Sequence, residues 1–346
     1  MALENTISVI AWNIAAISEL EDNIELERAL KEENELNHEM LFLLLSLMYD
    51  ARSIEKVKDN IQNGSTESLG YALELLDIFV SEEIKTLLFP LFDDKPVSEK
   101  LRQLQVYFPR AKYNKVEVLI HIMNRDYNTL TRWTKACAVE AYGNLENPEL
   151  NYDLISNLFN PDRLIRETAA RVIFEISPKT YHEVGRRIPS KVKWELDKLV
   201  ANKDGLFRYQ SDRFKFLAGL PYFKSLNNDM MVKLVKEFDL RILKQGASTI
   251  TNSARTNYVL NIVCSGQVLT NEKGADEVLG EGRIFGPFFT LSRKNSIESK
   301  TLSETVLLSL TEEKFYELMY NYREFIEIFV ELIDDKSFLE ETEIVE

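Results

Sequence analysis

Helical periodicity is the feature that most constrains the fold of this chain. From Ile7 to about Val200 apolar residues recur at steps of three and four, as in Ile7, Ile10 and Ile14, and strand-like alternation is rare. Such spacing gathers apolar side chains on one face of a helix. Glycine supplies 12 and proline 9 of the 346 residues, which is too few for a turn-rich β protein. The segment up to Val200 is therefore predicted to be an all-α array of helices.

Two helical segments in this array match each other at an offset of 31 residues. The matched positions are Thr134, Ala138, Ala141 and Leu145 in the first copy, and Ile165, Ala169, Val172 and Ile176 in the second. Lys135 and Arg166 also correspond, and a weaker third copy is predicted around Ala72. Small residues let neighbouring helices approach closely, and stacked helix pairs then bury a continuous core.

The second copy carries a resemblance to a known repeat. Asp162, then Ile165-Arg166, then Ala169-Ala170 is similar to the HEAT repeat, which has an aspartate, an aliphatic-basic pair and alanines one turn later. This resemblance implies a HEAT-like helical solenoid. The alternative is an irregular helical domain whose two segments match by chance.

The composition of the chain changes near Leu206, where glycine, serine, threonine and β-branched residues become more frequent. Short strands bounded by turn residues are predicted at 249–251, 258–263, 267–270 and 305–309, with helices at 212–217 and 229–238 before them and at 312–320 and 323–334 after them. The predicted fold is thus α+β and multidomain. A helical domain at 1–204 precedes a small β-roll, or jelly roll, at 205–336 that is flanked by helices, and an acidic tail follows at 337–346.

The second region resembles the cyclic-nucleotide-binding domain over about 120 residues. The phrases that carry the resemblance are, in order, Leu220-Pro221-Tyr222-Phe223, Gly246, the strand from Tyr258 to Val268, Leu279-Gly280-Glu281-Gly282 and Ile284-Phe285-Gly286. In ligand-binding members of that family, a short helix opens directly after the Phe-Gly pair, and its free N–H groups receive the cyclic phosphate. A glutamate after the glycine and an arginine about nine residues further on complete that family site.

This sequence departs from the family at both positions. Pro287 stands where the glutamate is expected, which also removes a backbone donor, and Asn295 or Ser296 stands where the arginine is expected. Arg293 and Lys294 lie about two residues early and offer a remodelled phosphate contact. The candidate ligand-binding residues are therefore Phe285, Gly286, Pro287, Phe288, Arg293, Lys294, Asn295 and Ser296.

Other classes of protein are disfavoured by charge and by missing motifs. The 42 basic and 56 acidic residues give a formal charge of −14, which repels a phosphate backbone, so no nucleic-acid partner is expected. Two cysteines and three histidines, together with the absence of nucleotide-binding, protease and hydrolase motifs, predict no disulfide framework, no metal site, no cofactor and no catalytic residue. Without a signal peptide or a long apolar run, the protein is expected in the cytoplasm, or tethered to the inner face of a membrane without inserting into it.

Helical repeats followed by such a roll resemble the soluble C-terminal region of bacterial fusion proteins whose membrane domain is of the ATP/ADP carrier type. The phrases Ala29-Leu30 to Asp50, Tyr71 to Asp77 and Trp133 to Ala136 carry this likeness. It implies a non-enzymatic regulatory or interaction module whose partner is a protein or a fused transporter domain, with standard cyclic-nucleotide binding lost. The alternative is a genuine sensor of cyclic AMP, cyclic GMP or another phosphate-bearing nucleotide.

Overall fold

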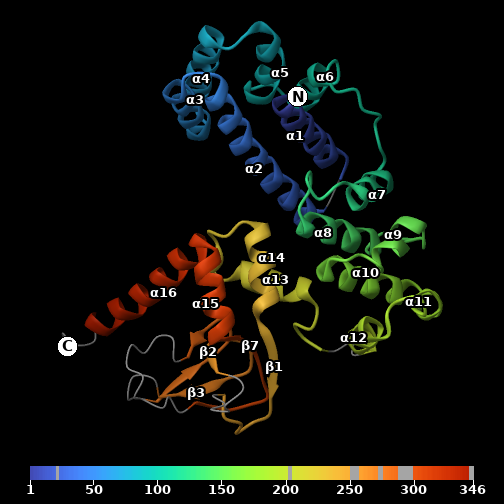
Figure 1. Cartoon of the computed structure of the whole chain (residues 1–346), viewed down its shortest axis with the longest axis vertical. Coiled ribbons are helices and arrows are strands. Elements are labelled where there is room, and N and C mark those ends of the chain that lie inside the picture. The colour runs from blue at the N-terminus through green and yellow to red at the C-terminus, as the bar shows by residue number, and fades with distance from the viewer. Residues whose placement is uncertain (21–22, 202–204, 250–256, 272–275, 287–298, 343–346) are drawn as a thin grey trace. The chain divides into compact units, whose positions relative to one another are not determined.

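The computed structural model describes residues 1–346 except 21–22, 202–204, 250–256, 272–275, 287–298 and 343–346, and after Leu332 it describes the backbone alone (Figure 1). The chain divides into two compact units, Met1–Arg187 and Ile188–Glu346. The division lies earlier in the sequence than the predicted domain boundary between residues 204 and 205, because α12 (Ser190–Ala201) groups with the second unit. None of the helices within the described ranges has the length and apolar character of a membrane span.

The first unit is helical. Its elements are α1 (Ala2–Glu19), α2 (Ile24–Met48), α3 (Ala51–Asn63), α4 (Thr66–Phe79), α5 (Glu82–Phe92), α6 (Val97–Leu104), α7 (Lys115–Asn124), α8 (Arg132–Gly143), α9 (Tyr152–Asn157), α10 (Arg163–Ile176) and α11 (Pro178–Gly185). Local signals set many of the boundaries. Asn114 and Glu117 form a capping box at the start of α7, and Gly64, with φ of 67°, ends α3. The predicted all-α character of this region is confirmed.

The two matched copies correspond to α8 and α10, which pack side by side (Figure 1). Thr131 caps α8 and Asp162 caps α10 at equivalent positions. The helices approach closely at Gly143, where an added Cβ would lie 2.8 Å from the side chain of Val172. A polar contact also joins two equivalent positions, Glu140 of α8 and Arg171 of α10, at 3.0 Å. The pair α7–α8 therefore stacks on the pair α9–α10, with α8 against α10 and α7 against α9.

The corresponding basic residues have the same structural role. Lys135 is buried, and its ammonium donates to the carbonyl oxygens of Met123, at 3.4 Å, and of Arg125. Arg166 donates to the carbonyl oxygens of Asn160, at 2.7 Å, and Pro161. Each cation thus binds the carbonyl groups of the segment between the two helices of its own pair. Burial lowers the pKa of Lys135, and the charge of Asp126 acts in the opposite direction.

On its other side α8 contacts α2, whose buried Glu33 accepts from the Thr131 backbone N–H at 2.7 Å and from Thr134 Oγ1 at 2.6 Å. The weaker third copy was expected in α4, but α4 contacts α3 and α5. Ala72 and Leu76 of α4 are buried in a separate core that α1 to α6 share. The helix that follows α8 in the stack, on the side of Glu33, is therefore α2 and not a third copy of the repeat. α2 is distant from α8 in the sequence.

The second unit contains α12, α13 (Gln210–Gly219), the 3-10 turn η1 (Pro221–Phe223), α14 (Asn228–Glu237), β1 (Asp239–Leu243), β2 (Tyr258–Ser265), β3 (Val268–Thr270), β4 (Glu277–Leu279), β5 (Ile284–Phe285), β6 (Ser299–Thr301), β7 (Thr305–Thr311), α15 (Glu312–Asn321) and α16 (Arg323–Thr342). Two antiparallel sheets form, with strand orders β1-β7-β2-β5 and β4-β3-β6. The predicted strands at 258–263, 267–270 and 305–309 are confirmed, whereas 250–251 lie outside the described residues. The structure adds β1, β4, β5 and β6, which sequence reasoning missed.

Candidate polar site inside the roll

The predicted ligand-binding segment begins where β5 ends. Phe285 is fully buried and pairs with Asn261 of β2 across the sheet. Gly286 has φ of 141°, and a Cβ added there would lie 2.5 Å from the carbonyl oxygen of Val259 and 3.3 Å from Asn261 Nδ2. Glycine is therefore required for the chain to pass this close to β2. The other six candidates, Pro287, Phe288, Arg293, Lys294, Asn295 and Ser296, lie outside the described residues.

A cluster of polar side chains lies directly beside Gly286, and we call it the roll cluster: Arg241 of β1, Asn261 of β2 and Ser309 of β7. Ser309 Oγ donates to Asn261 Oδ1 at 2.7 Å, and Arg241 Nη1 lies 3.4 Å from the same oxygen. Arg241 Nη1 also donates to the carbonyl oxygen of Thr249 at 2.7 Å. Asn261 and Ser309 are both completely buried. Their strands pair them directly, so the two side chains share one face of the sheet.

One donor of the roll cluster is not used. Asn261 Nδ2 is buried and has no hydrogen-bond partner among the described residues, and the same holds for Thr270 Oγ1 on β3. Leaving a buried donor unpaired costs about 1–3 kcal/mol. Folded proteins seldom leave such groups unsatisfied, and a bound ligand or water is a common reason when they do. The roll cluster therefore has the character of a binding site as well as of a packing contact.

The charge of Arg241 adds to this character. Its guanidinium lies 4.4 Å from the ring centroid of Tyr258, and within the described part of the chain it donates through Nη1 alone and forms no ion pair. Burial lowers the pKa of Arg241, while the negative charges of ionised Tyr258 and of Asp239 act in the opposite direction. A partly desolvated guanidinium with unused donors favours an anionic partner.

The interior face of the roll has a second, apolar end. Val263, Val268, Leu279, Phe285 and Leu307 form one buried cluster there. Val263 and Leu307 continue the same strand faces that carry Asn261 and Ser309, since residues two apart point to the same side. The interior face therefore carries apolar side chains at the end of Phe285 and the polar side chains of the roll cluster at the other end.

Sequence reasoning missed all three members of the roll cluster. A signal was present for two of them, because Asn261 and Ser309 each interrupt the apolar run of a strand that is otherwise buried. Arg241 gave no such signal, because the strand that carries it was not predicted.

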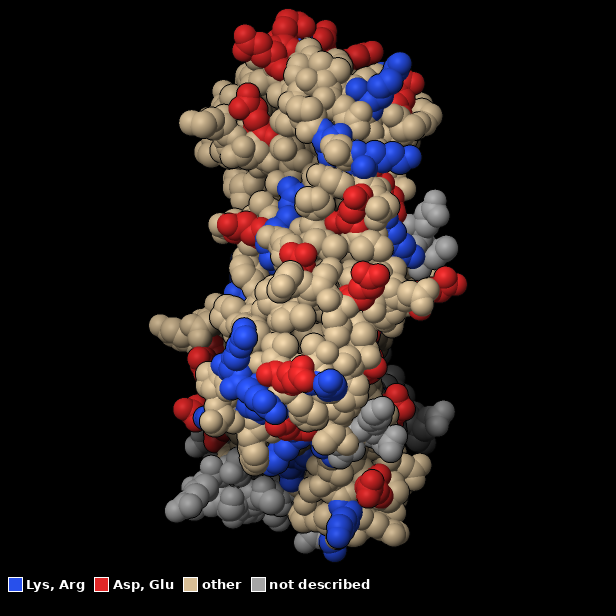
Figure 2. Space-filling model, turned by 90° about the vertical axis from the view of Figure 1, so that its right-hand side faces the viewer, with Lys and Arg blue, Asp and Glu red and all other residues tan. Residues whose placement is uncertain are grey.

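Two of the three histidines, His38 and His121, contact aromatic rings in the helical unit. The ring of His38 lies 5.7 Å from that of Phe92, and burial lowers the pKa of His38. His121 lies 4.2 Å from the ring of Tyr113. No group of three or more metal-ligating side chains gathers anywhere in the described residues. On the face shown in Figure 2, Lys and Arg are interspersed with Asp and Glu.

No family model matches this chain, and no curated protein matches it. Among solved structures, it is similar to the catabolite activator protein of Thermus thermophilus, with 21% identity over 36% of this chain and a TM-score of 0.31. That match spans 61% of the other protein. The sensor domain of the transcriptional regulator DNR of Pseudomonas aeruginosa matches 40% of this chain at 16% identity, with 94% of that domain covered and a TM-score of 0.32.

A third similar structure is the C-linker/CNBHD of zELK channels, crystallized in the presence of cAMP. It is 18% identical over 47% of this chain, with 95% of that chain covered and a TM-score of 0.29. The structures that this chain is similar to thus include regulatory, sensor and cyclic-nucleotide-binding-type domains.

Proposed function

We propose that this chain is a non-enzymatic regulatory and interaction module, and that its roll does not bind cyclic nucleotide in the standard way. The observation that carries the proposal is the roll cluster beside Gly286. Asn261 accepts from both Ser309 and Arg241 at the point where Phe285-Gly286 leads into the segment that lacks the expected glutamate. A side chain that could accept from a ribose hydroxyl is absent from position 287, where the residue is proline.

The helical unit supplies the interaction surface in this proposal. The stacking of α7–α8 on α9–α10, with matching caps and matching cations, supports a HEAT-like array that presents repeated helix faces to a protein partner. We propose a membrane transporter domain of the ATP/ADP carrier type as that partner, either fused or separate. The support for this partner is the sequence likeness of the helical phrases.

The test is a thermal melt of the full chain with cyclic AMP, cyclic GMP, ATP or ADP at millimolar concentration. A ligand present at 100 times its dissociation constant stabilises the folded state by roughly 2.7 kcal/mol, which raises the melting temperature by several degrees for a unit of this size. We expect no shift with either cyclic nucleotide. A shift with cyclic AMP or cyclic GMP that saturates with concentration would show that the standard function is retained.

The unused donors of Arg241 and Asn261 favour a second function, the sensing of another anionic small molecule by the roll. In this case a shift with ATP or ADP is expected, and Arg241→Gln should abolish it. Arg283→Gln is a matched control, because it removes the same charge from an exposed side chain of the same unit. Equal shifts in both variants would exclude the roll cluster as the site.

A further inference from the structure

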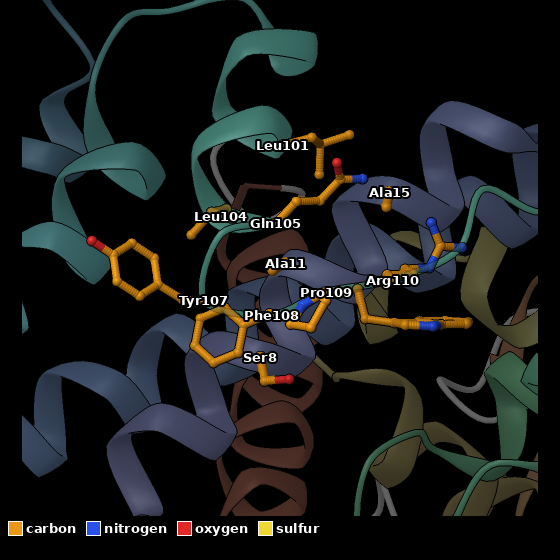
Figure 3. A pocket seen from close by; sticks show the side chains of 11 residues that line it. Ser8, Ala11, Ala15, Leu101, Leu104, Gln105, Tyr107, Phe108, Pro109 and Arg110 are labelled. Carbon is orange, nitrogen blue, oxygen red and sulfur yellow. The ribbon is translucent and has the colours of Figure 1, made fainter.

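Two apolar surfaces of the helical unit are open to a partner, a pocket and one helix face. The pocket has a volume of about 300 Å³ and lies between α1 and the segment that starts with α6. Figure 3 shows Tyr107 and Arg110 on opposite sides of it. Arg110 is the one charged residue among the described residues of the lining, and both of its terminal nitrogens bind Glu19, at 3.1 and 2.6 Å. The pocket therefore offers no charged group that selects a partner, whereas the helix face does.

The helix face belongs to α2, whose residues 40–48 are all apolar except Ser46. A helical segment that is apolar on every side is typical of a helix that is buried on every side. In the structure only one side of this segment is fully buried, at Leu41 and Leu45. The other side is exposed at Met40, Leu43, Leu47 and Met48. A contiguous apolar surface that is open to solvent in this way indicates an interaction site.

The exposed side continues a face of α2 that is covered where α8 begins. Positions 29, 33, 36, 40, 43 and 47 follow each other at steps of four and three, so they lie on one side of the helix. Ala29 and Glu33 are buried, and Glu33 accepts from the backbone N–H of Thr131, the N-cap of α8. Beyond Glu33 lie four residues that we call the α2 stripe, and their exposed fractions rise along the helix: Leu36 37%, Met40 47%, Leu43 56% and Leu47 78%. The α2 stripe has the spacing of residues that contact a second helix.

The charge around the α2 stripe is negative. Residues 32–58 include six acidic and three basic residues, a net charge of −3, and all three basic residues are on α3. On α2 itself no lysine or arginine follows Lys31, whereas Glu35 and Glu39 are exposed on the turns that carry Leu36 and Met40. Lys58 of α3 pairs with Glu39. The whole chain has a formal charge of −14, so a second copy of it would bring negative charge against negative charge, and a cationic partner is favoured.

We propose that the α2 stripe binds a cationic amphipathic helix of a protein partner. The apolar face of that helix covers the four residues of the stripe, and its basic side chains lie beside Glu35 and Glu39. The bound helix thus extends the cover that α8 gives to the same side of α2 at Glu33. This inference rests on the proposed interaction role of the helical unit and adds the chemistry of the segment that the unit recognises.

The test is isothermal titration calorimetry of the full chain with a short synthetic helix that has leucine on one face and lysine on the other. A second peptide has glutamate in place of lysine, and therefore the same apolar face with the opposite charge. We expect the lysine peptide to bind, and the glutamate peptide to bind at least about tenfold more weakly. Equal affinities, or no binding heat from the lysine peptide up to millimolar concentration, would overturn the proposal.

Leu43→Asp separates contact with the α2 stripe from a general attraction between an acidic protein and a basic peptide. The variant adds a negative charge, so a general attraction would strengthen. A carboxylate buried against leucine side chains should instead weaken binding at least about tenfold. Ile24→Asp is the matched control, because Ile24 is 74% exposed at the start of the same helix and lies off the stripe. It should not weaken binding.

Circular dichroism and the melting temperature should stay near those of the parent protein in both variants. Leu47→Asp, at the most exposed position of the stripe, replaces Leu43→Asp if that variant does not fold. Undiminished affinity in a folded stripe variant would overturn the proposal. So would a dimer in sedimentation velocity that Leu43→Asp dissociates and Ile24→Asp does not, because a second copy would then be the occupant.

The outcome is separable from that of the proposed function of the roll. A melting shift with a cyclic nucleotide would contradict the proposal for the roll and leave peptide binding unaffected. Loss of peptide binding would contradict the inference about α2 and leave the melts with nucleotides unchanged. The parent chain and Leu43→Asp should therefore give the same response to each nucleotide while they differ in peptide affinity.

Discussion

The two units use buried polar groups in different ways. In the helical stack, Glu33 accepts two hydrogen bonds at the start of α8, and Lys135 donates to two carbonyl oxygens between α7 and α8. In the roll, and among the residues that the structure describes, Asn261 has a filled acceptor and an unpaired donor, and Arg241 donates through only one of its nitrogens. The first arrangement fixes how helices stack. The second leaves hydrogen-bond donors available to a ligand, and for this reason we place the candidate site in the roll.

The difference between the two units follows from where helices and strands leave backbone groups without a hydrogen-bond partner. A helix terminus has several free N–H or C=O groups in one place, so a single buried charge at the first turn can satisfy two of them. A strand interior offers no free backbone groups, because the sheet uses them, and a buried side chain there must find side-chain partners on neighbouring strands. Asn261 finds Ser309 and Arg241, and its remaining donor faces Gly286.

The largest expected effect comes from Gly286. Replacing it by alanine adds a Cβ that lies 2.5 Å from the carbonyl oxygen of Val259, at a φ of 141°. We expect a loss of about 3–5 kcal/mol from strain and overlap together. Gly280→Ala is the control, since no atom lies within 4 Å of its added Cβ. The measurement is urea unfolding of the full chain, and equal losses at the two positions would show that β5 does not approach β2 as described.

Glu33→Ala tests the helical side of the comparison. It removes the acceptor of the Thr131 N–H and the Thr134 hydroxyl in a buried place, and we expect the free energy of unfolding to fall by about 3 kcal/mol. Glu33→Gln keeps an acceptor and should cost less than half as much. The exposed Glu35→Ala, on the same helix, should change stability by less than about 0.5 kcal/mol. Similar losses for the two alanine variants would contradict a stacking role for Glu33.

Replacing glycine by alanine should change the free energy of unfolding in opposite directions at two helical glycines. Gly143→Ala brings a Cβ to 2.8 Å from the side chain of Val172 and should destabilise the stack by about 1–2 kcal/mol. Gly70→Ala, within α4, meets no atom within 4 Å and should stabilise the protein by about 0.5–1 kcal/mol. Both changes in the free energy of unfolding are to be measured by chemical denaturation. Stabilisation at Gly143 would mean that α8 and α10 are further apart than the structure has them.

The helical unit was easier to predict than the roll. Periodicity is a local signal, so the all-α character of this unit and the match between α8 and α10 could be read from the sequence. What could not be read is that α2, with Glu33, is the neighbour of α8, because α3 to α7 separate them in the chain. Local patterns show which face of a helix is apolar, and they do not show which distant helix covers it.

In the roll, the longer strands β2 and β7 and the short β3 were predicted, whereas β1, β4, β5, β6 and the roll cluster were not. The family resemblance drew attention to Phe285-Gly286, and the structure places Phe285 at the end of β5, a strand that was not predicted. The roll cluster depends on pairing between strands that are distant in sequence, such as Asn261 with Ser309, and that pairing cannot be read from either strand alone. The six other candidates, from Pro287 to Ser296, remain predictions.

The smallest expected effect concerns the helix-covered face of β2, opposite to Asn261. Cys264 is buried there, and burial raises the pKa of its thiol from 9.0 to about 12. Below pH 9 the thiol is protonated in both the folded and the unfolded chain. Between pH 9 and 12 the unfolded chain loses a proton that the folded chain keeps, so the free energy of unfolding falls as the pH rises. At pH 10 this loss is about 1 kcal/mol.

The measurement is the free energy of unfolding of the parent chain and of Cys264→Ala at pH 8 and at pH 10. The difference between the two proteins removes the contributions of all other titrating groups, and the parent should lose about 1 kcal/mol more than the variant over this interval. A dry, apolar environment on this face of β2 predicts that result. An equal loss in both proteins would mean that water reaches Cys264, and the polar character of the roll would then extend to both faces of the strand instead of being confined to the side of Asn261.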